Sequence, residues 1–302
     1  MISIEQNKER QLTRLRAQRQ LYFSAKNIFE WQVFLAGPIS VGAIILSSRY
    51  PSMKGLVAAW GLFLTLLDIF WLTPWRKKIQ DVAARIQESF DCDVLDLPWQ
   101  ELKAGKKPDD ELIKEHADKY DRHNPNDESI ENWYSAKVDE LPIYMARIAC
   151  QRSNCWWDAE QRRYYARIFI VSILIIFMVF LFLAILTKSS LENYIISIIV
   201  PLSPLLLLGI RHYLEQKEAS SRLDSLKEHA SSLWDEALSG KSATDMTARS
   251  RVLQDEILEN RRKTPPVLDV IYQHLRSKHE KQMNYCIEKL VLEAKRKGGV
   301  VA

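Results

Sequence analysis

Four long apolar runs constrain this chain more than any other feature of its sequence. They cover residues 31–48, 55–75, 168–187 and 193–210, and they hold 77 of the 302 residues but only one charged residue, Asp68. All other lysines, arginines, aspartates and glutamates fall in the rest of the chain. Such segregation excludes a single globular core, a disordered chain and a secreted disulfide scaffold.

Each run is long enough to cross a lipid bilayer as one helix. About 20 apolar residues span roughly 30 Å of hydrocarbon, and in lipid a helix satisfies its own backbone hydrogen bonds. Helices buried in a soluble bundle would show an amphipathic stripe, whereas residues 168–187 are apolar on all sides. We therefore expect an all-α, polytopic membrane protein with four transmembrane helices.

Short connections between the runs predict two hairpins. Residues 49–54 separate the first two runs and residues 188–192 the last two, so each pair returns to the side from which it started. We expect hairpins over residues 31–75 and 168–210, a basic amphipathic helix over 1–30, and polar helical segments over 76–167 and 211–302. The two polar segments are expected to build one helical domain.

Positive charge predicts the side on which the polar segments lie. Fifteen lysines and arginines lie near the spans on that side, against Arg49, Lys54 and Lys188 at the hairpin tips. By the positive-inside rule, both termini and both polar segments are cytoplasmic. The four cysteines then lie in a reducing compartment, where disulfides are not expected.

The polar segments show helical periodicity. A series of apolar residues at Ala219, Leu223, Leu226, Ala230, Leu233 and Ala237 steps by four and three residues, as in an a/d seam. This seam predicts either packing against the 79–90 helix of the same chain or a contact between subunits. Helices are also predicted over 243–263 and 267–297, on either side of Pro265-Pro266, and a loop-rich insertion is predicted over 103–129.

Signatures of catalysis and of metal binding are missing from the sequence. No phosphate-cradling glycine loop, nucleophile elbow, HExxH or kinase motif occurs, and the cysteines form no CxxC pair. We therefore predict neither an enzyme nor a metal or cofactor site.

Asp68 is the one ionisable residue inside the apolar runs, about two turns from the cytoplasmic end of the second span, with Thr65 nearly one turn before it. A charge at that depth costs several kcal/mol unless it faces water or a partner. Two interpretations stay open. Asp68 and Thr65 line a pore or cavity, or Asp68 is held by a structural hydrogen bond to a neighbouring helix.

Pro201 and Pro204 lie inside the fourth span, where each removes a backbone donor and favours a kink. A kink at this position serves either a hinge or static packing. We group both prolines with the membrane-interior candidates.

Two basic clusters are candidates for binding a ligand. Aromatic residues alternating with arginines either stack on bases and pair with phosphates or anchor a helix at the lipid headgroups. The first cluster precedes the third span and contains Arg152, Trp156, Trp157, Arg162 and Arg163. The second contains Arg261, Arg262 and Lys263, which are otherwise a solvated helix face.

Several consecutive segments resemble the SMODS-associating four-transmembrane effector family of CBASS antiphage systems. The resemblance covers almost the whole chain and is carried, besides the hairpins, by WRKKIQDVAARIQESFDCDVLDLPW (75–99), CQRSNCWWDAEQRRYY (150–165), RHYLEQKEASSRLDSLKEHASSLWDEAL (211–238) and RVLQDEILENRRKTPPVLDVIY (251–272). The segment over residues 103–126 matches nothing in that family.

This resemblance implies a pore-forming effector in the bacterial inner membrane. Its activating ligand would be a cyclic oligonucleotide made by a cGAS/DncV-like nucleotidyltransferase, and its partners would be the lipid bilayer and further copies of itself, with no nucleic acid polymer. Two alternatives stay open: a non-conducting membrane-anchored sensor or scaffold, and a membrane-bound enzyme.

Overall fold

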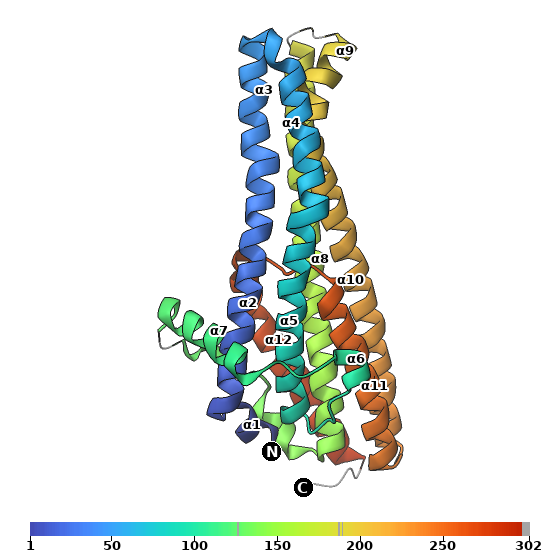
Figure 1. Ribbon diagram of the computed structural model, residues 1–302. Helices are drawn as coiled ribbons and strands as arrows, with labels where there is room; N and C mark the ends of the chain where they lie inside the picture. Colours follow the sequence, from blue (N-terminus) through green and yellow to red (C-terminus); the bar gives the residue numbers. More distant parts are fainter. Residues whose placement is uncertain (126, 187, 189, 298–302) are drawn as a thin grey trace. The chain divides into compact units, whose positions relative to one another are not determined.

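A computed structural model describes residues 1–125, 127–186, 188 and 190–297 of the chain. These residues form helices and connecting segments, without a strand among them (Figure 1). The helices are α1 (Ile2–Gln6), α2 (Glu9–Phe34), α3 (Ser40–Arg49), α4 (Lys54–Leu67), α5 (Thr73–Val94), α6 (Glu101–Ala104), α7 (Asp110–His123), α8 (Ile143–Leu186), α9 (Leu191–Tyr194), α10 (Val200–Leu238), α11 (Ala243–Lys263) and α12 (Asp269–Arg296). The all-α prediction is confirmed.

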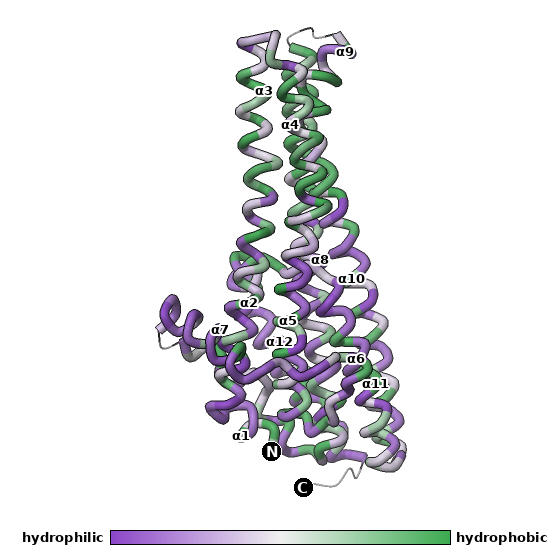
Figure 2. Tube along the Cα trace, viewed as in Figure 1, coloured by the Kyte–Doolittle hydropathy of each residue, from purple (hydrophilic) through white to green (hydrophobic). Residues whose placement is uncertain are grey.

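Four continuous helical stretches of the described chain are long and apolar enough to cross a membrane. They run over Glu9–Arg49, Pro51–Val94, Ile143–Leu186 and Leu191–Leu238, and each contains one of the four predicted runs, the third as far as Leu186. Figure 2 shows the hydrophobic residues gathered along α3, α4 and the adjoining parts of α8 and α10. Thr187 and Ser189, predicted to end the third span and to lie in the second hairpin turn, are outside the described residues.

The chain divides into two compact units. The hairpin unit consists of Ala25–Lys78 and Arg163–Lys217, and the polar unit consists of Met1–Ser24, Ile79–Arg162 and Glu218–Ala302. The hairpin unit contains all four apolar runs. Helices α2, α5, α8 and α10 contribute residues to both units.

In the part of the chain that the structure describes, three short π-helices occur, each in a span that contains proline. They are η1 (Leu35–Ile39), which includes Pro38, η3 (Asp68–Leu72), which precedes Pro74, and η6 (Ile195–Ile199), which precedes Pro201. A proline ring clashes with the carbonyl four residues earlier, and a widened turn relieves that clash. The third span has no proline, and α8 is an uninterrupted α-helix.

The seam of α10 packs inside the same chain. Leu223, Ala230 and Leu233 are buried in one apolar cluster with Phe90 of α5. Of the two interpretations left open by the sequence, the structure therefore supports packing within one chain. The predicted helix over 243–263 is confirmed as α11, and the last helix begins at Asp269, after an extended segment that contains both prolines.

The prediction of a loop-rich insertion over residues 103–129 is wrong over half of its length. Helix α7 occupies Asp110–His123 and buries Ile113, Ala117 and Tyr120 on one face. Its many charges lie on the other faces, and Pro108 and Pro125 flank the helix rather than interrupt it. The high charge of this segment masked a short amphipathic helix. Asn126 lies outside the described residues.

Candidate functional site

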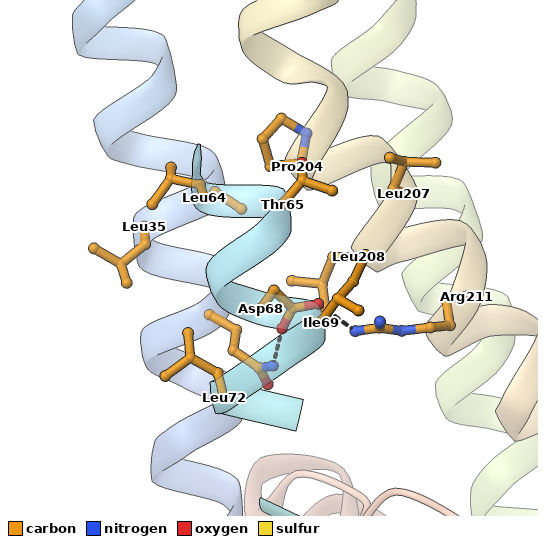
Figure 3. Close-up of a pocket in the computed structure, with 12 residues that line it drawn as sticks. Leu35, Leu64, Thr65, Asp68, Ile69, Leu72, Pro204, Leu207, Leu208 and Arg211 are labelled. Atoms are coloured by element: carbon orange, nitrogen blue, oxygen red, sulfur yellow. Dashed lines mark hydrogen bonds and ion pairs between the residues drawn. The ribbon is translucent and has the colours of Figure 1, made fainter. Parts of the chain in front are cut away.

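The hairpin unit holds a buried cluster of polar side chains around Asp68. Arg211 of α10 donates from Nη2 to Asp68 Oδ2 at 2.6 Å, and Gln32 of α2 donates from its side-chain amide to Oδ1. Figure 3 shows the Asp68 carboxylate on its helix facing the guanidinium of Arg211 on the neighbouring helix. The charge of Asp68 is thus paired inside the membrane-spanning part of the chain, where an isolated carboxylate would be costly.

Thr73 completes this cluster and fixes its geometry. Its hydroxyl donates to Asp68 Oδ1 at 3.1 Å and accepts from Gln32 Nε2 and Arg211 Nη2, each at 3.1 Å. One hydroxyl supplies one donor and two acceptor positions, so all three are used. A fully connected polar network in a low-dielectric interior holds its members in one arrangement.

A cavity of about 240 Å³ lies beside the cluster. Asp68 and Thr65 both line this cavity. Arg211 is the last of the α10 residues that line it. Most of the surface is apolar: the remaining lining residues are Gln32, Leu35, Ala36, Leu64, Ile69, Leu72, Pro204, Leu207 and Leu208 (Figure 3). The hydroxyl of Thr65 donates to the carbonyl of Gly61 at 3.1 Å, so it adds little polarity to the cavity.

Asp68 has features of both interpretations, and its place in a conducting pathway stays a prediction. It makes hydrogen bonds to neighbouring helices and it lines a cavity. Sequence reasoning did not identify Gln32 and Arg211 as its partners, because Arg211 lies just beyond the fourth apolar run, whereas Asp68 lies two turns inside the second. Their contact becomes visible only when the positions of the helices along one another are known.

Pro201 and Pro204 occupy different positions in the hairpin unit. Pro204 lines the cavity, whereas Pro201 packs against Gly61 of α4. A Cβ at Gly61 would lie 3.0 Å from the backbone oxygen of Val200 and 3.3 Å from Cα of Pro201. Glycine therefore allows the backbones of α4 and α10 to approach closely, as small residues do in membrane helix pairs.

The first basic cluster predicted from the sequence contributes to an antiparallel seam between α8 and α12 of the polar unit. Arg152 donates to Ser231 Oγ at 2.9 Å and to Cys286 Sγ at 3.0 Å. The rings of Trp156 and Trp157 each lie 5.4 Å from the ring of His279, centroid to centroid. These contacts give the three predicted residues a packing role at the seam.

Arg162 and Arg163 fall on opposite sides of the division between the units. Arg162 is buried in the polar unit, donates to the carbonyl of Pro265 at 2.9 Å and pairs with Asp158 at 3.0 Å. Arg163 is the first residue of its segment in the hairpin unit. The five residues of this cluster are thus divided between two units, and none of them lines the cavity beside Asp68.

We expect the seam between α8 and α12 to weaken as the pH falls. Burial lowers the pKa of His279 below its ordinary value of 6.5, while Glu160 and Lys278 have smaller, opposing effects. The unfolded chain then binds more protons than the folded chain as the pH falls through 6.5 toward the lowered pKa. The stabilisation from neutral His279 is therefore complete above pH 6.5 and is lost below it.

Hydrogen exchange of the α12 amides, corrected for the intrinsic pH dependence of exchange, would measure this loss between about pH 7.5 and about pH 5. His279→Phe should abolish the pH dependence. His116→Phe is the matched control, because burial also lowers the pKa of His116 but this residue lies on α7. If His279→Phe showed the same pH dependence as the unmodified chain, His279 would not be the group that causes it.

The second basic cluster also makes ion pairs within the polar unit. Arg261 pairs with the buried Asp91 at 2.5 Å, Arg262 pairs with Asp81, and Lys263 pairs with Glu259 at 2.8 Å. Only Lys263 among the three is mostly exposed, with 60% of its side chain accessible. A double alanine variant at Arg261 and Arg262 would therefore test folding as much as ligand binding.

Comparison with known protein families matches residues 1–290 to the SMODS-associating 4TM effector domain. Among curated proteins, a protein described as a probable CBASS effector molecule, from Bacillus cereus (strain VD146), is 26% identical over 230 residues. The aligned region covers 74% of this chain and 76% of that protein. No solved structure matches the chain.

Proposed function

We propose that this chain, which belongs to the SMODS-associating 4TM effector domain family, is an effector of CBASS antiphage defence that permeabilises the bacterial inner membrane. The family match over residues 1–290 and the relative from Bacillus cereus both support a role in defence. We also propose that its role is not catalytic, since no nucleophile elbow, HExxH or kinase motif occurs in the sequence.

The proposed topology places both termini and both polar segments in the cytoplasm. Its support is the distribution of positive charge, with fifteen lysines and arginines near the spans on the side of the polar segments against three at the hairpin tips. Four helices able to cross a membrane, in a family of 4TM effectors, make this a multi-pass membrane protein.

The observation that carries the pore proposal is the paired charge of Asp68 beside a cavity in the membrane-spanning unit. A helical anchor needs no ionisable group at that depth, and ionisable groups inside spans commonly mark ion pathways. The ion pair with Arg211 neutralises Asp68 at rest, and breaking it would leave a charged, hydratable wall. A resting state held by such contacts lies a few kcal/mol below an open one and responds to a ligand that favours the open state.

We further propose that the pore is a homo-oligomer. Within one chain, α4 and α10 lie in direct contact at Gly61 and Pro201, and Gly37 packs near Leu205. Contacts as close as these leave too little room for an ion pathway along the helix pair itself. Several copies arranged around a common axis would supply the missing space.

The proposed trigger is a cyclic oligonucleotide, or a partner protein, that acts on the polar unit. Arg152, Trp156 and Trp157 remain our proposed ligand contacts, because each is only partly buried and together they combine a cation with aromatic faces. Lys263 is the most accessible member of the second cluster. Ligand binding at the α8 seam would act on the same helix that forms the third span.

Release of dye from liposomes tests this proposal. The purified chain should retain the dye when alone and release it when one member of a panel of cyclic di- and trinucleotides is added. Asp68→Asn should raise release without nucleotide, because it removes the charge that holds Arg211.

Ser172→Ala is the matched control, since the hydroxyl of Ser172 is exposed on α8 and bonds only to its own helix at Ile168. It should behave as the unmodified chain does. Retention of dye by inserted protein under every condition, together with co-purifying proteins, would support the non-conducting scaffold instead.

A further inference from the structure

Two carboxylates flank Arg211 in the hairpin unit, and only one of them is bonded to it. Arg211 pairs with Asp68 at 2.6 Å. Glu215 lies four residues further along α10, on the same face of that helix. Its Oε2 atom is buried and has no hydrogen-bond partner among the described residues.

The register of α4 and α10 shows that Arg211 reaches toward the hairpin tips to make this pair. Lys54 contacts Asn193 at 3.1 Å and Gly61 contacts Val200, so positions that lie level on the two helices differ by 139. Asp68 is then level with residue 207, one turn before Arg211. Arg211 therefore pairs with a residue whose position on the neighbouring helix lies about 6 Å nearer the hairpin tips, the rise of four residues.

This direction is opposite to the usual one for an arginine at the end of a membrane span. Such side chains normally extend toward water, because the hydrocarbon core is costly for a charge. In the usual direction the next acceptor along α10 is the carboxylate of Glu215. Arg211 thus has one partner toward the membrane interior and a second partner toward the polar end of its helix.

Arg76 lies near the carboxylate of Glu215 but makes no hydrogen bond to it. The same register places Arg76 level with Glu215, whose charge is close enough to act on the Arg76 guanidinium. Yet Nε and Nη1 of Arg76 have no hydrogen-bond partner in the described chain, and the guanidinium lies 5.5 Å from the ring centre of Phe29. The Glu215 oxygen is therefore charge-compensated at rest but still available to a donor.

We infer that Arg211 is a gate with two positions, held on Asp68 in the closed state and transferred to Glu215 in the open state. The change is a rotation of one side chain along its own helix. It moves the guanidinium away from the end of the cavity and frees the Asp68 carboxylate to face the cavity. This inference rests on the proposed pore function for its effect on conduction, although the partner exchange itself does not depend on conduction.

Two measurements on the full chain in liposomes test the exchange. The first is dye release, with and without the activating cyclic nucleotide. The second is modification of Arg211 by p-hydroxyphenylglyoxal added from the aqueous side and quantified by mass spectrometry, which needs no conduction. An arginine that extends toward water reacts faster than one paired inside the span.

Loss of one charged hydrogen bond changes the balance between the two positions about tenfold or more. Asp68→Asn should therefore raise both basal release and Arg211 modification about tenfold. Glu215→Gln should reduce both basal and triggered release about tenfold, because the open state loses its partner for Arg211. In the double variant Asp68→Asn/Glu215→Gln, basal release should return to the level of the unmodified chain, because Arg211 then has neither carboxylate.

Glu218→Gln is the control, since Glu218 is an exposed α10 residue paired with Arg222 rather than Arg211. If Glu215→Gln fails to insert, Glu215→Asp shortens the same side chain and should give an intermediate reduction. A double variant with the same release and the same Arg211 reactivity as Asp68→Asn alone would overturn the two-position gate. If Arg211 modification rises in Asp68→Asn but no variant releases dye, the exchange of partners is supported and the proposed pore function is contradicted.

Discussion

Arg251→Ala is expected to lower the free energy of unfolding of the polar unit by about 3–5 kcal/mol, the usual cost of leaving one partner of a buried ion pair uncompensated. Arg251 donates to Glu88 at 2.7 Å, and only 5% and 1% of the two side chains are exposed. The same guanidinium bonds to Asp255 at 2.9 Å and to the carbonyl of Pro98 at 3.1 Å. One substitution therefore leaves several buried acceptors without a donor.

Burial already raises the pKa of Glu88, and the charge of Arg251 opposes that effect. Without Arg251 the carboxyl group should take up a proton at higher pH, so the variant should regain stability as the pH falls through the raised pKa. Native-state hydrogen exchange of α5 and α11 amides, in the reconstituted chain, would measure both effects.

The matched control replaces the pair rather than one member. Glu88→Gln/Arg251→Met should be much less destabilising than Arg251→Ala, because Glu88, the more deeply buried of the two carboxylate partners of Arg251, is then no longer charged. If the single variant were as stable as the double variant, Arg251 would not be compensating Glu88.

Gly61→Val is expected to disrupt the packing of the two hairpins, at a cost of about 1–3 kcal/mol for an overpacked contact. The neighbours of the added Cβ are backbone atoms of α10 at Val200 and Pro201, which lie at 3.0 and 3.3 Å and cannot rotate away as a side chain does. The helices must therefore separate. That separation would also disturb the Asp68–Arg211 pair, which joins the same two segments.

Gly42→Val provides the comparison, because nothing lies within 4 Å of a Cβ at this membrane-embedded glycine. Thermal unfolding in one detergent, with insertion verified for both, should show a lower midpoint for Gly61→Val and little change for Gly42→Val. A similar decrease in both variants would indicate an effect of valine on the helix rather than a steric contact between hairpins.

The sequence by itself determined the four spans, the bounds of α11 and, within two residues, the bounds of α12. Runs of apolar residues have one stable conformation in lipid, so their positions follow from composition alone. The prolines at 265 and 266 similarly fixed the end of α11, because proline cannot continue a helix. Helix α7 was missed because its three buried apolar residues are few among many charges.

The candidate site was only half determined in this way. Asp68 was identifiable because a single charge in an apolar run stands out against its neighbours, and Thr65 because it is one turn away. The other members of the cluster, Gln32, Thr73 and Arg211, were not identifiable. Polar residues at the ends of spans are common, and their partners depend on how deep each helix lies in the membrane. The two basic clusters were identifiable as cations, but not as members of ion pairs with Asp91, Asp81 and Glu259.

Local rules of lipid solvation and helix periodicity thus determined which segments of this protein become helices and which residue is costly in the membrane. Tertiary structure alone decided how far each helix lies along its neighbour, and hence that the guanidinium of Arg211 meets Asp68 rather than Glu215. The reason is physical: helix formation depends on residues within a few turns, whereas an ion pair between helices depends on a register set by close contacts elsewhere, such as Gly61 against Val200.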